Sequence, residues 1–173
     1  MVTIRHYNES NAPSVGKLIA DTYSEFNLSF ASSEERDLLL GPFRHARSQE
    51  KENRKAIARV IRASIVFVAQ DEGEIVGVLR GRKEKLQSLF VAGDRHRQGI
   101  GRRLVERFEQ ECIGQGAAVI RVAATLYAVP FYMAMGYKKS TGVRSMKSFD
   151  GSGLRYQPMK KVLAHKKSIA RKT

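Results

Sequence analysis

A strand, a basic loop containing glycines and an amphipathic helix follow one another in the segment 86–113. The apolar run from Leu86 to Ala92 predicts a largely buried strand. The loop that follows, DRHRQGIG, ends in Gly99 and Gly101, which leave its backbone free to approach a ligand closely. Apolar side chains then recur at the spacing of one helix face: Leu104, Val105, Phe108, Cys112 and Ile113.

This order of elements predicts an anion site. The first turn of a helix has unpaired N–H groups and carries the positive end of the helix dipole, so it suits a phosphate. A glycine turn with solvated arginines is the alternative, but it does not explain strand, loop and helix in one register. A Walker loop is excluded because G-K-S/T is missing, and a dinucleotide fingerprint because its third glycine and later acid are missing. Four arginines add positive charge around the loop: Arg95, Arg97, Arg102 and Arg103.

The segment resembles motif A of the GCN5-related N-acetyltransferases (GNAT), written L-x-V, a turn, then R/Q-x-x-G-x-G/A. Gly99 and Gly101 match the glycine positions, while His96 takes the Arg/Gln position. In that family the loop holds the pyrophosphate of acetyl-CoA, mainly through backbone N–H groups. The resemblance therefore implies an acetyl-CoA site made by Phe90, Val91, His96, Arg97, Gln98, Gly99, Ile100, Gly101 and Arg102.

A second segment, TLYAVPFYMAMGY at 125–137, resembles motif B of the same family, N-x-x-A-x-x-F/L-Y-x-x-x-G-F/Y. Its residue types predict a short helix between Pro130 and Gly136, with Phe131, Ala134 and Met135 turned inward. The resemblance implies that Thr125, which replaces the asparagine, and Tyr132 contact the cofactor, and that Tyr132 protonates the sulfur of the departing CoA. A buried structural tyrosine is the alternative. The positions in register are Ala128, Phe131, Tyr132, Gly136 and Tyr137.

Acyl transfer to an amine needs a neutral amine, a donor for the developing oxyanion and a proton for the leaving thiolate. In the family the oxyanion donor is a backbone N–H of the motif A strand, here Phe90 or Val91. Glu25, Glu84 and Asp94 are candidates for the general base, directly or through water, and each is equally consistent with a surface role.

The rest of the chain predicts one α/β domain. The order strand, helix, strand over 86–124 implies a right-handed crossover and a parallel pair. The hairpin turn is expected at 71–73. Further strands are expected at 2–7, 64–69, 74–80, 117–124 and near 137–143 and 154–160, and helices between 11 and 26, at 34–40 and at 51–62.

The resemblance covers about residues 2–163 and implies the GNAT fold. That fold is a mixed, mostly antiparallel central sheet flanked by helices, with a splayed parallel pair at the acyl-CoA site. We assign 1–163 to the acetyltransferase domain and 164–173 to a basic, disordered tail. The family usually shapes its acceptor pocket where this chain has residues 23–62. Candidate pocket residues there are Tyr23, Glu25, Phe26, Phe43 and His45.

The formal net charge of +14 favours anionic ligands or partners. Its excess is concentrated in 44–62 and 160–172, where aromatic residues of the base-stacking kind are missing, so a solvated face is favoured over nucleic acid. The composition is that of a soluble globular protein, and no apolar run approaches a membrane span. Cys112 reads as a buried thiol, and the four histidines show no metal-ligand spacing. We expect a cytoplasmic monomer or homodimer without a metal.

These observations together favour direct transfer of an acetyl group from acetyl-CoA to an amine. The acceptor cannot be identified from the chain. Three alternatives remain open: transfer of another acyl group, a CoA-binding regulator without turnover, and a basic protein that interacts with nucleic acid on a GNAT scaffold.

Overall fold

One sheet of eight strands runs through the computed structural model, which describes residues 1–164. The expected tail lies outside the described residues apart from Ala164. The strand order is β1-β2-β3-β4-β5-β8-β6, and β7 pairs with β8. The strands are β1 (Thr3–His6), β2 (Ile65–Asp71), β3 (Glu74–Arg82), β4 (Lys85–Val91), β5 (Val119–Thr125), β6 (Lys138–Lys139), β7 (Arg144–Ser148) and β8 (Gly151–Val162).

Strands β4 and β5 form the expected parallel pair, and the other pairs described are antiparallel. Helix α4 (Ile100–Gly114) is the crossover between them. Their pairing is short, because only Lys85 and Leu86 of β4 pair with Arg121 and Val122 of β5. Beyond that point β4 continues against β3, and β5 continues against β8. The predicted mixed sheet with a splayed parallel pair is therefore confirmed.

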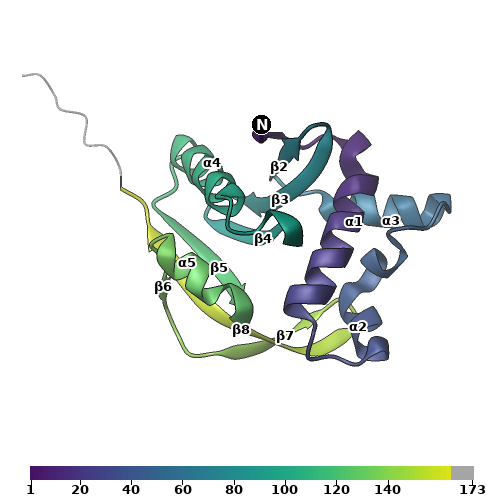
Figure 1. The fold of residues 1–173 in the computed structure, drawn as a ribbon. Coiled ribbons are helices and arrows are strands. Elements are labelled where there is room, and N and C mark those ends of the chain that lie inside the picture. The colour runs from purple at the N-terminus through teal and green to yellow at the C-terminus, as the bar shows by residue number, and fades with distance from the viewer. Residues whose placement is uncertain (165–173) are drawn as a thin grey trace, which may run out of the picture.

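Helices cover both faces of the sheet (Figure 1). Helices α4 and α5 (Val129–Ala134) pack on one face, and α1 (Ala12–Thr22), α2 (Ser33–Leu40) and α3 (Lys51–Ile61) pack on the other. Neighbouring residues of β2 point to opposite faces, so Phe67 joins the α4 core and Val68 the α1 core. Burial of apolar side chains on both faces holds the central strands rigidly in place.

The helix ends follow the local sequence. Ser32 and Glu35 form a reciprocal capping box at the start of α2. Asn11 stands at the N-cap of α1 without a side-chain cap bond. Beyond Thr22, α1 continues as a π-helical turn, η2 (Tyr23–Asn27), which carries the predicted helix past its regular end.

Several details of the prediction are wrong. Ala134 is exposed, although the pattern placed it inward, whereas Met135 is buried as expected. Ile113 is 38% exposed although the adjacent Cys112 is buried, because at 3.6 residues per turn Ile113 lies off the face that Leu104 and Phe108 turn inward. The C-terminal part forms β6, β7 and β8 rather than two strands. None of the helices found in residues 1–164 is long and apolar enough to cross a membrane.

Candidate active site

A cleft opens where β4 and β5 separate. Arg80 of β3 pairs with Ser88 and Gly81 pairs with Leu86, so Gln87 is an extra residue that bulges out of β4. The bulge lies directly after the last residue that pairs with β5, and it bends the strand away from its parallel neighbour. The resulting pocket has a volume of about 690 Å³ and is lined by both strands, by the loop before α4 and by η2 and α5.

The bulge also decides which backbone donors face the cleft. The N–H of Ala92 donates to Val76 O of β3 at 2.9 Å. Because antiparallel residues alternate in direction, Phe90 likewise faces β3, while Leu89 and Val91 turn their N–H groups toward the side that β5 has left. Of the two residues expected to donate to an oxyanion, Val91 is therefore the one whose N–H faces the pocket.

The loop before α4 presents a row of free backbone donors. Arg103 N donates to Gly99 O at 3.0 Å and begins the helical ladder. Within residues 1–164, the preceding N–H groups, 97–102, donate to no backbone carbonyl or side chain. Positive φ values at Arg97 (62°) and Gly99 (79°) turn the chain so that successive N–H groups face one side, the geometry of an anion-binding nest. These free donors stand at the helix N-terminus, where the sequence predicts an anion site.

His96 holds this loop against the end of β4. Its Nε2 lies 2.8 Å from Val91 O, so the ring donates to the last carbonyl of the strand. The ring also packs on Phe26, with centroids 4.6 Å apart. His96 accordingly contributes by fixing the loop, which explains how histidine can stand at the Arg/Gln position of the motif.

Gly101 keeps the cleft open between α4 and α5. A Cβ at this position would lie 3.3 Å from the ring of Phe131 on α5 and 3.8 Å from Val91 Cγ2. A side chain larger than hydrogen would therefore project across the gap that a long ligand needs to pass through. The other predicted loop residues also line the pocket, with the exception of Gln98. They are His96, Arg97, Gly99, Ile100 and Arg102.

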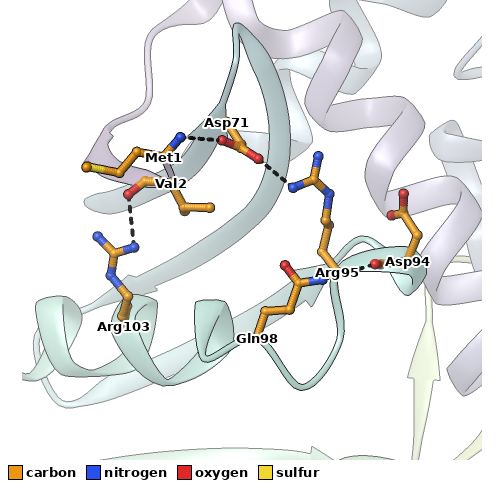
Figure 2. Close-up of polar contacts among 7 residues, drawn as sticks. All are labelled: Met1, Val2, Asp71, Asp94, Arg95, Gln98 and Arg103. Atoms are coloured by element: carbon orange, nitrogen blue, oxygen red, sulfur yellow. Dashed lines mark hydrogen bonds and ion pairs between the residues drawn. The ribbon is translucent and has the colours of Figure 1, made fainter.

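Arg95 is fastened to the β2–β3 hairpin (Figure 2). Its guanidinium donates to Asp71, which also accepts from the Met1 amine at 3.0 Å. These two cations hold the pKa of the Asp71 carboxyl below its usual range. Gln98 donates to Asp94 O at 3.3 Å, and Arg103 to Val2 O at 2.9 Å, so the loop is braced from outside the pocket.

Tyr132 lines the pocket from α5 and is buried, with 4% of its surface exposed. Its ring packs edge-on against Phe131 and Tyr137, with centroid distances of 5.2 and 5.5 Å. Burial raises the pKa of Tyr132, so the phenol keeps its proton at neutral pH. No hydrogen bond of its hydroxyl is found in the described part of the chain, which leaves that proton available to a ligand.

The rest of the pocket wall is formed by η2, which also contacts the loop through Phe26 and His96, and by β7 and β8. Tyr23 and Phe26 line it as expected, whereas Glu25, Phe43 and His45 lie outside the lining. Phe43 is buried against Phe149 instead. Sequence reasoning missed Asn27, Ser88 and Tyr127, which are close neighbours of predicted residues, and Met146 and Leu154, which come from the distant strands β7 and β8.

Two side-chain contacts hold this part of the wall together. Thr125 Oγ1 donates to Asn27 Oδ1 at 2.7 Å and joins β5 to η2. Ser148 Oγ donates a hydrogen bond to Leu39 O at 2.8 Å, so in its 2.9 Å contact with Tyr23 the tyrosine hydroxyl is the donor. The hydroxyl of Thr125, a residue expected to contact the cofactor, is therefore already engaged by a protein partner.

No described residue in the pocket wall is aspartate or glutamate. Glu25, Glu84 and Asp94, the candidate bases, all lie outside it. Within residues 1–164, no group of three His, Cys, Asp or Glu side chains is placed to hold a metal ion. Charge in the pocket is therefore positive and comes from arginines and the helix N-terminus.

Comparison with known proteins agrees with this geometry. The family model described as Acetyltransferase (GNAT) domain matches residues 31–163. None of the curated proteins matches the sequence significantly.

Solved structures of acetyltransferases share the fold. A GCN5-related N-acetyltransferase from Rhodopseudomonas palustris superposes with a TM-score of 0.75 at 19% identity, over 93% of this chain and 95% of that one. PaiA N-acetyltransferase from Thermoplasma acidophilum, solved in complex with coenzyme A, gives 0.69 at 17% identity, over 94% and 99%. YncA from Salmonella typhimurium, solved with its cofactor acetyl-CoA, gives 0.62 at 14% identity, over 96% of each chain.

Proposed function

The chain belongs to the GNAT acetyltransferase family, and we propose that it transfers an acetyl group directly from acetyl-CoA to an amine. Bound acetyl-CoA supplies an activated thioester whose carbonyl carbon accepts the amine. The observation that carries the proposal is the row of free N–H groups at 97–102, which opens into the same cleft as the Val91 N–H. One part of the cleft suits a pyrophosphate and the other suits a carbonyl oxygen that gains negative charge.

The residues of the chain divide the work by position. The N–H groups of 97–102, with Arg97 and Arg102 beside them, bind the pyrophosphate. Gly101 leaves room for the ligand beside Phe131. Val91 donates its N–H to the thioester oxygen and stabilises the charge that develops there. Tyr132, kept protonated by burial, gives its proton to the departing sulfur.

The proton of the amine leaves by a different route. Because no carboxylate of the described residues lines the pocket, water accepts the proton of the amine, and the Tyr132 oxygen regains a proton from water after the thiol has formed. Tyr23, whose hydroxyl proton is engaged by Ser148, offers its oxygen as an acceptor to the incoming amine. In this proposal Tyr23 thus marks the acceptor part of the pocket.

Calorimetry with CoA tests the first requirement of this function. Gly101→Val should weaken CoA binding at least about 30-fold, since the side chain blocks the cleft and displaces Phe131, a loss comparable to two charge-assisted hydrogen bonds. Gly114→Val, at the other end of the same helix with nothing within 4 Å of its Cβ, is the matched control and should bind normally. Equal affinity of a folded Gly101→Val protein and the parent would refute the proposed site.

CoA release with a panel of amines then separates an enzyme from a regulator. An acetyltransferase should release free CoA only when both acetyl-CoA and an amine are present. Tight CoA binding without release across primary amines, anilines and peptide N-termini would favour the regulator. The same assay with propionyl-CoA in place of acetyl-CoA identifies the acyl group.

A further inference from the structure

A second hollow lies between α1 and α3, away from the acetyl-CoA pocket. It has a volume of about 620 Å³ and shares no lining residue with the first pocket. Figure 1 shows α3 beside α1, on the side of the molecule away from α4 and α5. We call this hollow the basic groove, and it is lined by Glu9, Ala12, Pro13, Lys17, Ala46, Arg47, Ser48, Gln49, Lys51, Arg54, Lys55, Ile57, Ala58, Arg59 and Arg62.

The charge of the groove is almost entirely positive. Its lining holds Lys or Arg at seven positions and one carboxylate, Glu9. Arg62 pairs with Glu9 at 2.6 Å, and Arg47 pairs with Asp21 at 2.8 Å. Lys55 lies 3.9 Å from Glu52, at the limit of an ion pair. Among residues 1–164, the four remaining cations have no carboxylate within ion-pair distance: Lys17, Lys51, Arg54 and Arg59.

Three of the basic residues of the groove form a stripe along α3. Ile57 and Ile61 are buried and turn one side of α3 toward α1, where Gly16 lets Ile57 approach closely. Lys51, Lys55 and Arg59 lie four residues apart on an exposed stripe of the same helix. With a rise of about 1.5 Å per residue, the stripe from Lys51 to Arg59 is about 12 Å long. Small side chains, among them Ala12, Ala46 and Ala58, form its floor and keep it hollow.

We propose that the basic groove binds the sugar–phosphate backbone of a nucleic-acid duplex. A duplex carries one phosphate charge per about 1.7 Å of its axis, so a stripe of this length faces several phosphates at once. Arginine, present at four of the seven basic positions, presents a planar fork that matches phosphate oxygens.

The composition of the lining favours a duplex over the other polyanions. Single-stranded nucleic acid is normally held by aromatic side chains that stack on bases, and no aromatic residue lines the groove. A protein partner would need a core of large apolar or aromatic side chains, and the apolar lining here is alanine, proline and one buried isoleucine. Backbone contact alone is the mode by which duplexes are bound without regard to sequence.

Fluorescence anisotropy with a 20-base-pair RNA duplex and a DNA duplex of equal length tests the proposal. Log affinity should fall steeply with log salt, by about 0.9 for each phosphate neutralised. The variant Lys51→Glu, Lys55→Glu, Arg59→Glu should lose about 30-fold or more in affinity and should show a shallower salt slope. The difference between the two duplexes reports whether the groove also detects A-form geometry.

A matched control separates the groove from the charge of the whole molecule. Lys138→Glu, Lys139→Glu, Lys147→Glu makes the same change in net charge on exposed residues of β6 and β7. It should keep most of the affinity. Equal losses in the two variants, or equal binding of polyglutamate and duplex at equal charge, would overturn the proposal. Acetyl-CoA binding should be unchanged in both, because none of these residues lines its pocket.

Discussion

In the proposed mechanism Tyr132 serves both the core and the chemistry. Its ring packs in the core with Phe131 and Tyr137, while its hydroxyl borders the cleft. Desolvation raises its pKa, so the phenol still holds its proton when the thiolate leaves. His96 has a similar double role, because its ring both packs on Phe26 and ties the loop to Val91.

Tyr132→Phe separates the two roles. Phenylalanine keeps the packing and removes the proton, so the variant should fold and bind acetyl-CoA nearly as well as the parent, with kcat lower by roughly 10- to 1000-fold. Because the pKa is raised, the parent should keep this contribution at least up to about pH 10, the ordinary pKa of a tyrosine, and lose it only above. Steady-state rates between pH 7 and 10 measure both effects.

Two results would count against this role. A kcat equal to that of the parent would show that water, and not Tyr132, protonates the departing sulfur. A loss of CoA binding or of the folded state would make the tyrosine structural.

At the scale of elements, α3 is held by a side chain from the sheet. Arg80 of β3 donates from Nε to Ile61 O at 3.0 Å and from Nη2 to Val60 O at 2.6 Å, the last carbonyls of the helix. Its Nη1 also reaches Ser88 Oγ of β4 at 3.3 Å. Within residues 1–164 this guanidinium has no carboxylate partner. Its positive charge instead interacts favourably with the negative end of the α3 dipole.

Arg80→Met should show the strength of this link. Methionine keeps the apolar stem but leaves the carbonyls of α3 unpaired, so the free energy of unfolding should fall by about 2–3 kcal/mol. Chemical denaturation measures that loss, and hydrogen exchange should rise first in the last turn of α3. Arg82→Met, two residues on and exposed, is the control and should change stability by less than about 0.5 kcal/mol. Similar losses in both proteins would deny Arg80 a special role.

The local elements were predictable because their signals are local. The strand, loop and helix of 86–113 follow from apolar spacing, glycines and charge, and the parallel pair follows from their order. The bulge at Gln87 is not visible in the pattern, because it depends on register with β3. The same holds for the Thr125–Asn27 contact, since those residues lie 98 positions apart and meet only after folding.

At the scale of the molecule, positive charge is concentrated in a few segments rather than spread evenly. The catalytic pocket needs only a local positive patch, yet the chain carries a formal net charge of +14. The sequence indicated an excess in 44–62 but favoured a solvated face, because the groove forms only when α3 packs on α1. Like charges placed this close repel one another and lower the stability of the folded state.

Lys55→Glu should expose that cost. Lys55 has like charges four residues away on both sides, at Lys51 and Arg59, and each such pair destabilises a helix by about 0.2–0.5 kcal/mol. The substitution converts both into attractive pairs, although it also replaces the distant contact with Glu52 by a repulsive pair of carboxylates three residues apart. The folded state should therefore gain a few tenths to about 1 kcal/mol at low salt, and the gain should fade by about 1 M salt as the charges are screened. Thermal melting at low and high salt measures it, with Lys138→Glu as a control of equal charge, and a gain that is the same at both salt concentrations would exclude repulsion as its source.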